Sequence, residues 1–151
     1  KLREQVRKRS DETGDTFVLV GHSLGGYLAR EVARQLPNHV SQLITFGSPI
    51  YGGPKYTAAA SVFIRRGLDM DWVESIIEER EQIPIEVPLT TIISPSDAIV
   101  GYQCSIDRHQ LHAKLIEVDA NHVGMAFNPT IWKLVLEELQ LSKPLAAASA
   151  H

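Results

Sequence analysis

The chain has 151 residues, enough for one ordinary domain, and its 44% hydrophobic and 22% charged residues exclude a disordered chain or a collagen-like repeat. A single cysteine excludes an internal disulfide and therefore a disulfide-stabilised scaffold. Fifteen basic against eighteen acidic residues give a formal net charge of −3, which argues against a general nucleic-acid binder because such a protein needs a basic surface.

The first part of the chain alternates between helical and strand patterns. Leu2 and Val6 lie four residues apart among charged residues, which indicates the end of an amphipathic helix. Residues 16–20 form a short apolar run rich in β-branched side chains, which predicts a strand buried on both faces. Apolar residues then recur at helical spacing over residues 28–36, and residues 42–46 predict a second strand.

The segment between the second and third predicted strands is too long for a simple crossover. Residues 57–66 and 71–80 each show helical spacing, and Asp71 with Glu74 three residues later is typical of a helix start. We expect residues 50–88 to form a small helical cap insertion over a pocket, although a packed connection without mobility fits the pattern equally well.

Two further strands and a final helix complete the pattern. Residues 89–94 and 114–118 predict strands, and residues 129–141 predict a helix whose apolar face combines Ile131, Trp132, Val135, Leu136 and Leu139. Strands that alternate with helices predict an α/β fold, with a mostly parallel sheet and helices on both faces. We assign residues 1–143 to one partial domain and residues 144–151 to a disordered tail.

One sequence motif is typical of a catalytic site. Residues 21–25 read Gly-His-Ser-Leu-Gly, directly after a predicted strand and before a predicted helix, which is the context of a nucleophile elbow. We expect positions 21 and 25 to have no room for a side chain, because two chain segments nearly touch there, and Gly21 and Gly25 meet this requirement. We expect Gly26 to let the helix pack close to the strand. Ser23 is the candidate nucleophile, and the backbone N–H of Leu24 at the helix N-terminus is the candidate oxyanion donor. The alternative is a tight glycine-rich turn with an incidental serine.

A serine hydroxyl needs a base to become nucleophilic, and that base needs an acid to orient it. In this class of fold the chain order is serine, acid, histidine. Asp97 follows the third predicted strand and His122 follows the fourth, so both belong to the sheet edge that carries Ser23. Asp119 is the main rival of Asp97, and Asp107 fits a solvated turn.

The other histidines fit structural roles better than chemical ones. His22 is adjacent to Ser23, but successive side chains diverge, so we expect it to be a packing residue. His109 and His112 fit surface or core-edge positions and lack an obvious third metal ligand, and His39 and His151 belong to no motif. We therefore expect no metal site and no cofactor.

Residues 21–26 resemble the nucleophile elbow of α/β-hydrolase lipases and esterases. Residues 46–49 resemble the end of the following strand in bacterial triacylglycerol lipases and their esterase relatives, and residues 94–100 and 121–125 are similar to their acid and histidine segments. The resemblance covers residues 16–139 and implies the C-terminal portion of an α/β-hydrolase fold. Further strands, and a loop with the second oxyanion donor, would then precede this stretch.

Motif and resemblance together imply a serine hydrolase that cleaves carboxylic esters through an acyl-enzyme on Ser23. The alternatives are a thioesterase or acyltransferase with the same three residues, or a catalytically silent hydrolase-like interaction module. The expected partner is a small-molecule or lipid-like ester, with Phe63 and Trp72 suggesting an apolar group. We expect no nucleic acid and no transmembrane segment in this stretch. The sequence indicates neither compartment nor oligomeric state.

Overall fold

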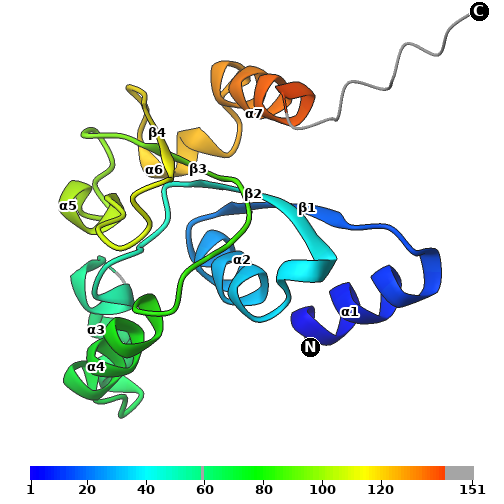
Figure 1. Ribbon diagram of the computed structural model, residues 1–151. Coiled ribbons are helices and arrows are strands. Elements are labelled where there is room, and N and C mark those ends of the chain that lie inside the picture. The colour runs from blue at the N-terminus through cyan, green and yellow to red at the C-terminus, as the bar shows by residue number, and fades with distance from the viewer. Residues whose placement is uncertain (59, 142–151) are drawn as a thin grey trace, which may run out of the picture.

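The computed structural model describes residues 1–58 and 60–141, and a single parallel sheet organises them. Its order is β1-β2-β3-β4, and each neighbouring pair of strands is parallel (Figure 1). The strands are β1 (Phe17–His22), β2 (Val40–Phe46), β3 (Leu89–Ile93) and β4 (Lys114–Glu117). The predicted α/β fold is confirmed, and the predicted tail at residues 144–151 lies outside the described residues.

Helices cover both faces of this sheet. Helices α1 (Leu2–Thr13) and α2 (Leu24–Gln35) lie on one face, and α7 (Pro129–Leu141) lies on the other (Figure 1). Side chains alternate between the faces of a strand, so Leu43 and Ile44 on β2 belong to two different cores. The core beneath α1 and α2 contains Val6, Ala29, Val32, Ala33, Val40, Leu43, Ile85, Val87 and Leu89. The core beneath α7 contains Ile44, Phe46, Ile92, Met125, Ile131 and Val135.

The burial of one strand and one helix differs from their apolar patterns. Strand β1 is an edge strand of the sheet in the described part of the chain, and Val20 is 39% exposed. That this strand is buried on both faces stays a prediction, because the further strands implied by the resemblance would lie beside it. On α7, Ile131 and Val135 are buried, but Trp132 and Leu136 remain 43% and 57% exposed. The buried stripe of α7 is narrower than its apolar spacing predicts, because only one side of the helix faces the sheet.

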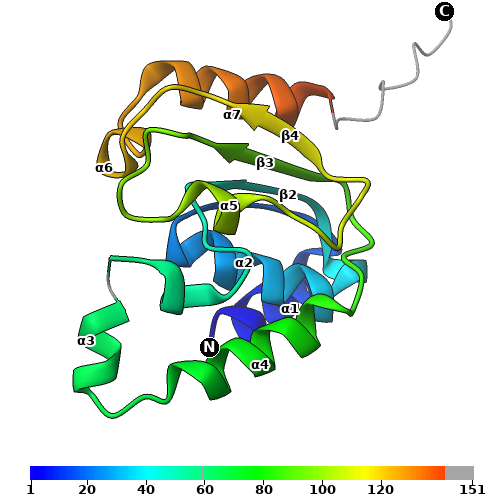
Figure 2. The ribbon, with the colours of Figure 1, turned by 90° about the vertical axis from the view of Figure 1, so that its left-hand side faces the viewer.

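The connection between β2 and β3 contains a short 3-10 turn, Gly53–Tyr56, and two helices, α3 (Ala60–Arg65) and α4 (Met70–Glu81). Figure 2 shows both helices on the side of the sheet that also carries α2. The N-cap of α4 is Asp69 and not Asp71 as predicted, because the Asp69 carboxylate accepts the N–H groups of Asp71 and Trp72 at 3.0 and 3.1 Å. That this insertion acts as a cap stays a prediction.

Buried ion pairs connect α2 to the end of this insertion. Arg30 and Arg34 of α2 both contact the Glu81 carboxylate, at 2.7 and 2.8 Å. Arg30 also contacts Asp107 at 2.7 Å, and the two side chains are 0% and 3% exposed. Asp107 is therefore a buried ion-pair partner and not the solvated turn acid expected from the sequence. These pairs fix the helix that follows Ser23 to the C-terminal end of α4.

We expect Glu81→Ala to lower the free energy of unfolding by about 3 kcal/mol, because it leaves two buried guanidinium groups without their shared partner. The matched control is Glu12→Ala, which removes an exposed partner of Lys8 and should cost about 0.5 kcal/mol or less. Equilibrium urea denaturation measures both values. Equal losses for the two variants would contradict the role assigned to the buried pairs.

Candidate active site

Ser23 occupies a strained turn between β1 and α2. Its backbone angles are φ 55° and ψ −128°, and it is the only residue other than glycine with positive φ in the described part of the chain. Such a conformation costs about 1–3 kcal/mol and persists only when the surroundings hold it. The Ser23 N–H donates to the Phe46 carbonyl at 3.0 Å, and the Ser23 carbonyl accepts the Gly26 N–H at 3.0 Å. These bonds fix the turn between the strand and the helix.

The close approach at this turn is between Gly21 and Gly26. A Cβ atom on Gly21 would lie 2.5 Å from the Gly26 Cα, and one on Gly26 would lie 1.9 Å from the Ser48 Oγ. In the part of the chain that the structure describes, a Cβ atom on Gly25 would meet nothing within 4 Å. The prediction that Gly25 must be small to relieve crowding is therefore wrong, whereas Gly26 does allow α2 to pack close to the strands.

His122 lies within hydrogen-bond reach of Ser23. It is the first residue of the short helix α6 (His122–Met125), whose N-cap Asn121 accepts the Gly124 N–H at 2.7 Å. The distance from His122 Nε2 to Ser23 Oγ is 3.0 Å, and that from His122 Nδ1 to Asp97 Oδ2 is 2.7 Å. In the tautomer that satisfies both contacts, Nδ1–H donates to Asp97 and Nε2 accepts the serine hydroxyl.

Asp97 is held by its own loop. Its side chain is 1% exposed, and its second carboxylate oxygen accepts the backbone N–H groups of Ile99 and Val100 at 2.8 and 2.9 Å. The rival Asp119 instead accepts the Ser96 hydroxyl at 2.6 Å. The structure thus brings Ser23, His122 and Asp97 together and directs Asp119 elsewhere. This arrangement can move a proton from a serine hydroxyl to an imidazole that a buried carboxylate orients.

No other histidine of the described residues belongs to the chain of side-chain contacts from Ser23 through His122 to Asp97, and His151 lies outside the described residues. The His22 ring stacks on Phe46 with ring centroids 5.0 Å apart, and burial together with the neighbouring His122 lowers the pKa of His22. His109 and His112 are exposed. Within residues 1–58 and 60–141, no group of three metal-ligating side chains could hold an ion.

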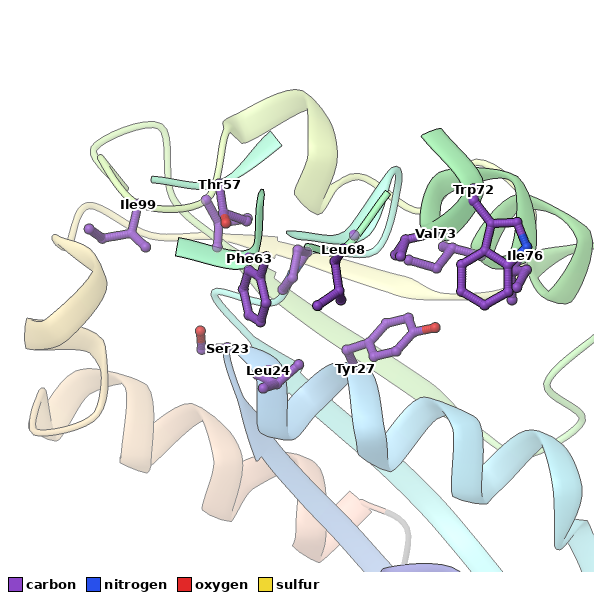
Figure 3. Close-up of a pocket in the computed structure, with 14 residues that line it drawn as sticks. Ser23, Leu24, Tyr27, Thr57, Phe63, Leu68, Trp72, Val73, Ile76 and Ile99 are labelled. Atoms are coloured by element: carbon purple, nitrogen blue, oxygen red, sulfur yellow. The ribbon is translucent and has the colours of Figure 1, made fainter. Parts of the chain in front are cut away.

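An apolar cavity of about 420 Å³ opens beside Ser23 (Figure 3). Leu24 and Tyr27 of α2 form its floor, and Trp72 and Ile76 of α4 lie at the end away from Ser23. The other lining residues are Pro49, Gly53, Thr57, Phe63, Leu68, Val73, Ile77, Ile99 and Val100. The cavity could accept an apolar group joined to an atom at Ser23.

Tyr27 is one of the lining residues that the sequence analysis missed, although its spacing of three residues from Leu24 places both on one helix face. Burial, with smaller contributions from Glu31 and Glu81, raises the pKa of Tyr27 to about 12, so its hydroxyl stays protonated and uncharged at neutral pH. The floor of the cavity therefore carries no charge at this position.

Leu24 lies next to Ser23 at the N-terminal end of α2. It is the first residue of α2, so its backbone N–H has no partner within the helix. The helix dipole places partial positive charge at the same end. Both features favour a negative charge beside Ser23.

Comparison with known proteins identifies a family for this chain. Residues 4–137 match the family described as a PGAP1-like alpha/beta domain. No curated protein sequence matches the chain. Among the described residues, no helix combines the length and the apolar character that a membrane crossing requires.

Solved structures of α/β-hydrolases are similar to this chain. A monoacylglycerol lipase from Paleococcus ferrophilus has a TM-score of 0.68 at 13% identity, covering 94% of this chain and 75% of the lipase. The esterase Pf2001 from Pyrococcus furiosus has a TM-score of 0.64 at 20% identity, covering 91% of this chain and 58% of the esterase. The mouse alpha/beta hydrolase domain-containing protein 10 has a TM-score of 0.61 at 22% identity, covering 92% of this chain and 67% of the mouse protein. At these identities the likeness establishes the shared fold.

We expect Gly26→Ala to lower the free energy of unfolding by about 2 kcal/mol, because its Cβ atom would overlap the Ser48 hydroxyl and crowd the Gly21 carbonyl. Gly25→Ala is the matched control on the same helix turn. It should leave stability unchanged or raise it by up to about 1 kcal/mol, since alanine favours the helix and the space is open. Thermal and urea unfolding measure both, and a more harmful Gly25→Ala would contradict this description of the turn.

Proposed function

Since the chain belongs to the PGAP1-like alpha/beta domain family, within the α/β-hydrolase superfamily, we propose that it is a serine hydrolase that cleaves carboxylic esters. The observation that carries the proposal is the continuous hydrogen-bonded chain from the Ser23 hydroxyl through His122 to Asp97, with contacts of 3.0 and 2.7 Å. A buried carboxylate that orients an imidazole, which in turn contacts a serine on a strained turn, is an arrangement suited to acyl transfer.

In the proposed reaction, Ser23 Oγ attacks the ester carbonyl while His122 Nε2 takes the hydroxyl proton. Asp97 keeps Nδ1 protonated and stabilises the imidazolium that forms. The negative charge on the former carbonyl oxygen is stabilised by the Leu24 N–H, and one such donor contributes about 10²–10³-fold in rate. His122 then gives its proton to the leaving alcohol, which leaves an acyl-enzyme on Ser23.

Water completes the proposed cycle. His122 takes a proton from a water molecule, the resulting hydroxide attacks the acyl carbon, and the proton returns to Ser23 Oγ as the carboxylic acid leaves. The same three side chains therefore serve both halves of the reaction, and no metal or cofactor takes part in any step.

The cavity supports an ester with an apolar acyl or alkyl group. Its volume of about 420 Å³ lies within the range of about 300–1,000 Å³ that small-molecule pockets occupy. The side chains that narrow it above the α2 floor, Phe63 and Leu68, are apolar, as are Trp72 and Ile76 at its far end. Burial of each methylene of such a group stabilises the complex by about 0.8 kcal/mol.

We expect Ser23→Ala to lower kcat for a short p-nitrophenyl ester by at least about 10⁴-fold, because the variant has no group that can become acylated. A fluorophosphonate probe should label the unaltered protein at Ser23, located by peptide mass spectrometry, and should not label the variant. Ser41→Ala is the control, because Ser41 is exposed near the start of β2, whereas Ser23 contacts Phe46 at the end of that strand. A folded protein that neither hydrolyses the ester nor reacts with the probe would support the silent interaction module instead.

We expect Ile76→Trp to shorten the apolar cavity from its far end. The ratio of kcat/KM for a ten-carbon acyl ester to that for a four-carbon ester should fall about 10-fold or more, whereas the four-carbon value should stay nearly constant. Ile83→Trp is the matched control because Ile83 is 53% exposed and does not line the cavity. An equal loss for both esters would show that the acyl chain does not reach this end.

A further inference from the structure

The helix that carries His122 is too short to hold its own position. Helix α6 has only four residues, and an isolated helix of this length is not stable in water. The His122 side chain nevertheless has to meet two partners, Ser23 and Asp97, at hydrogen-bond distance. Contacts from outside α6 must therefore fix its placement.

Two ring N–H groups bind carbonyls at the two ends of α6, that of its first residue and that of its C-cap residue. His22 Nε2 lies 3.0 Å from the carbonyl oxygen of His122, and Trp132 Nε1 donates to the carbonyl of Ala126, the C-cap residue, at 2.8 Å. The Ala126 N–H is directed to the carbonyls of Val123 and Gly124, so the His122 carbonyl is available to His22. A carbonyl oxygen can only accept, so the neutral His22 ring carries its proton on Nε2.

Phe46 contacts both of these rings. Its ring stacks on His22 at 5.0 Å between centroids and meets Trp132 edge-on at 5.9 Å with an interplanar angle of 74°. The Phe46 side chain is the last of β2 and only 2% exposed, so it is fixed by the core of the sheet. The His22 ring also lies 4.8 Å from the His122 ring.

We propose that His22 and Trp132, supported by Phe46, are positioning residues that hold α6 so that His122 stays within reach of Ser23 and Asp97. This inference rests on the proposed function, because it assigns the two ring N–H groups a part in the same reaction. They contact neither the reacting serine nor the carboxylate. Their effect arises because a displacement of about 1 Å in a reacting group can lower the rate about 10²-fold.

The test distinguishes the contribution of the His22 ring to the rate from that of its N–H group. His22→Phe keeps an aromatic ring beside Phe46 and loses the donor, whereas His22→Gln loses the ring and keeps an N–H at a similar distance from the backbone. Trp132→Phe removes the second donor. Leu136→Ala is the control, since Leu136 is 57% exposed on the same helix as Trp132.

We expect His22→Phe and Trp132→Phe each to lower kcat about 10-fold with KM nearly unchanged, and to slow fluorophosphonate labelling of Ser23 by a similar factor. His22→Gln should recover most of the loss, and Leu136→Ala should equal the unaltered protein. Melting curves identify a temperature at which every variant is folded, so that unfolding does not contribute to the rates.

The outcomes distinguish the two proposals. If the unaltered protein neither hydrolyses esters nor labels at Ser23, the proposed function fails. If it is active but His22→Phe and Trp132→Phe stay within about 2-fold of it, the positioning role alone is overturned. If His22→Gln loses as much rate as His22→Phe, the N–H contact is not what positions α6. A rise in KM at constant kcat would also contradict the inference, because it would indicate a lost contact with substrate.

Discussion

The contact between Gly21 and Gly26 is the constraint on which the rest of the candidate site depends. Because neither residue has a Cβ atom, the end of β1 and the first turn of α2 approach closely enough to form the strained turn at Ser23. The Ser48 hydroxyl occupies the space beside Gly26 and continues the same packing into the loop after β2. The serine conformation is thus a product of backbone packing and does not require any partner for its hydroxyl.

Each of the three side chains is positioned by its own local structure before they meet. The turn places Ser23, two backbone N–H groups hold the Asp97 carboxylate, and the contacts around α6 place His122. The elements that carry them follow β1, β3 and β4, whose carboxyl ends lie at one edge of a parallel sheet. Contacts of 3.0 and 2.7 Å between side chains so far apart in sequence follow from this shared edge.

Local sequence patterns predicted the strands and the candidate site residues, because both depend on residues close together in the chain. Apolar runs located the strands, and chain order after those strands selected Asp97 and His122, which the structure brings into contact. Long-range packing could not be predicted in this way. Which glycine is crowded depends on Ser48, far along the chain, and the burial of Asp107 depends on Arg30 of another helix. Spacing alone could not distinguish Asp69 from Asp71 as the helix cap, since both are acidic residues near the same turn.

Helix α2 lines the cavity beside Ser23 and also holds helix α4 through an ion pair. Leu24 and Tyr27 form the floor of the cavity, whereas the buried guanidinium of Arg30 holds the Glu81 carboxylate at the end of α4 at 2.7 Å. Helix α4 in turn presents Ile76 to the far end of the same cavity. The ion pair thus connects the helix at the floor of the cavity to the helix at its far end. A polar network outside the cavity lining therefore joins the two helices that border an apolar pocket.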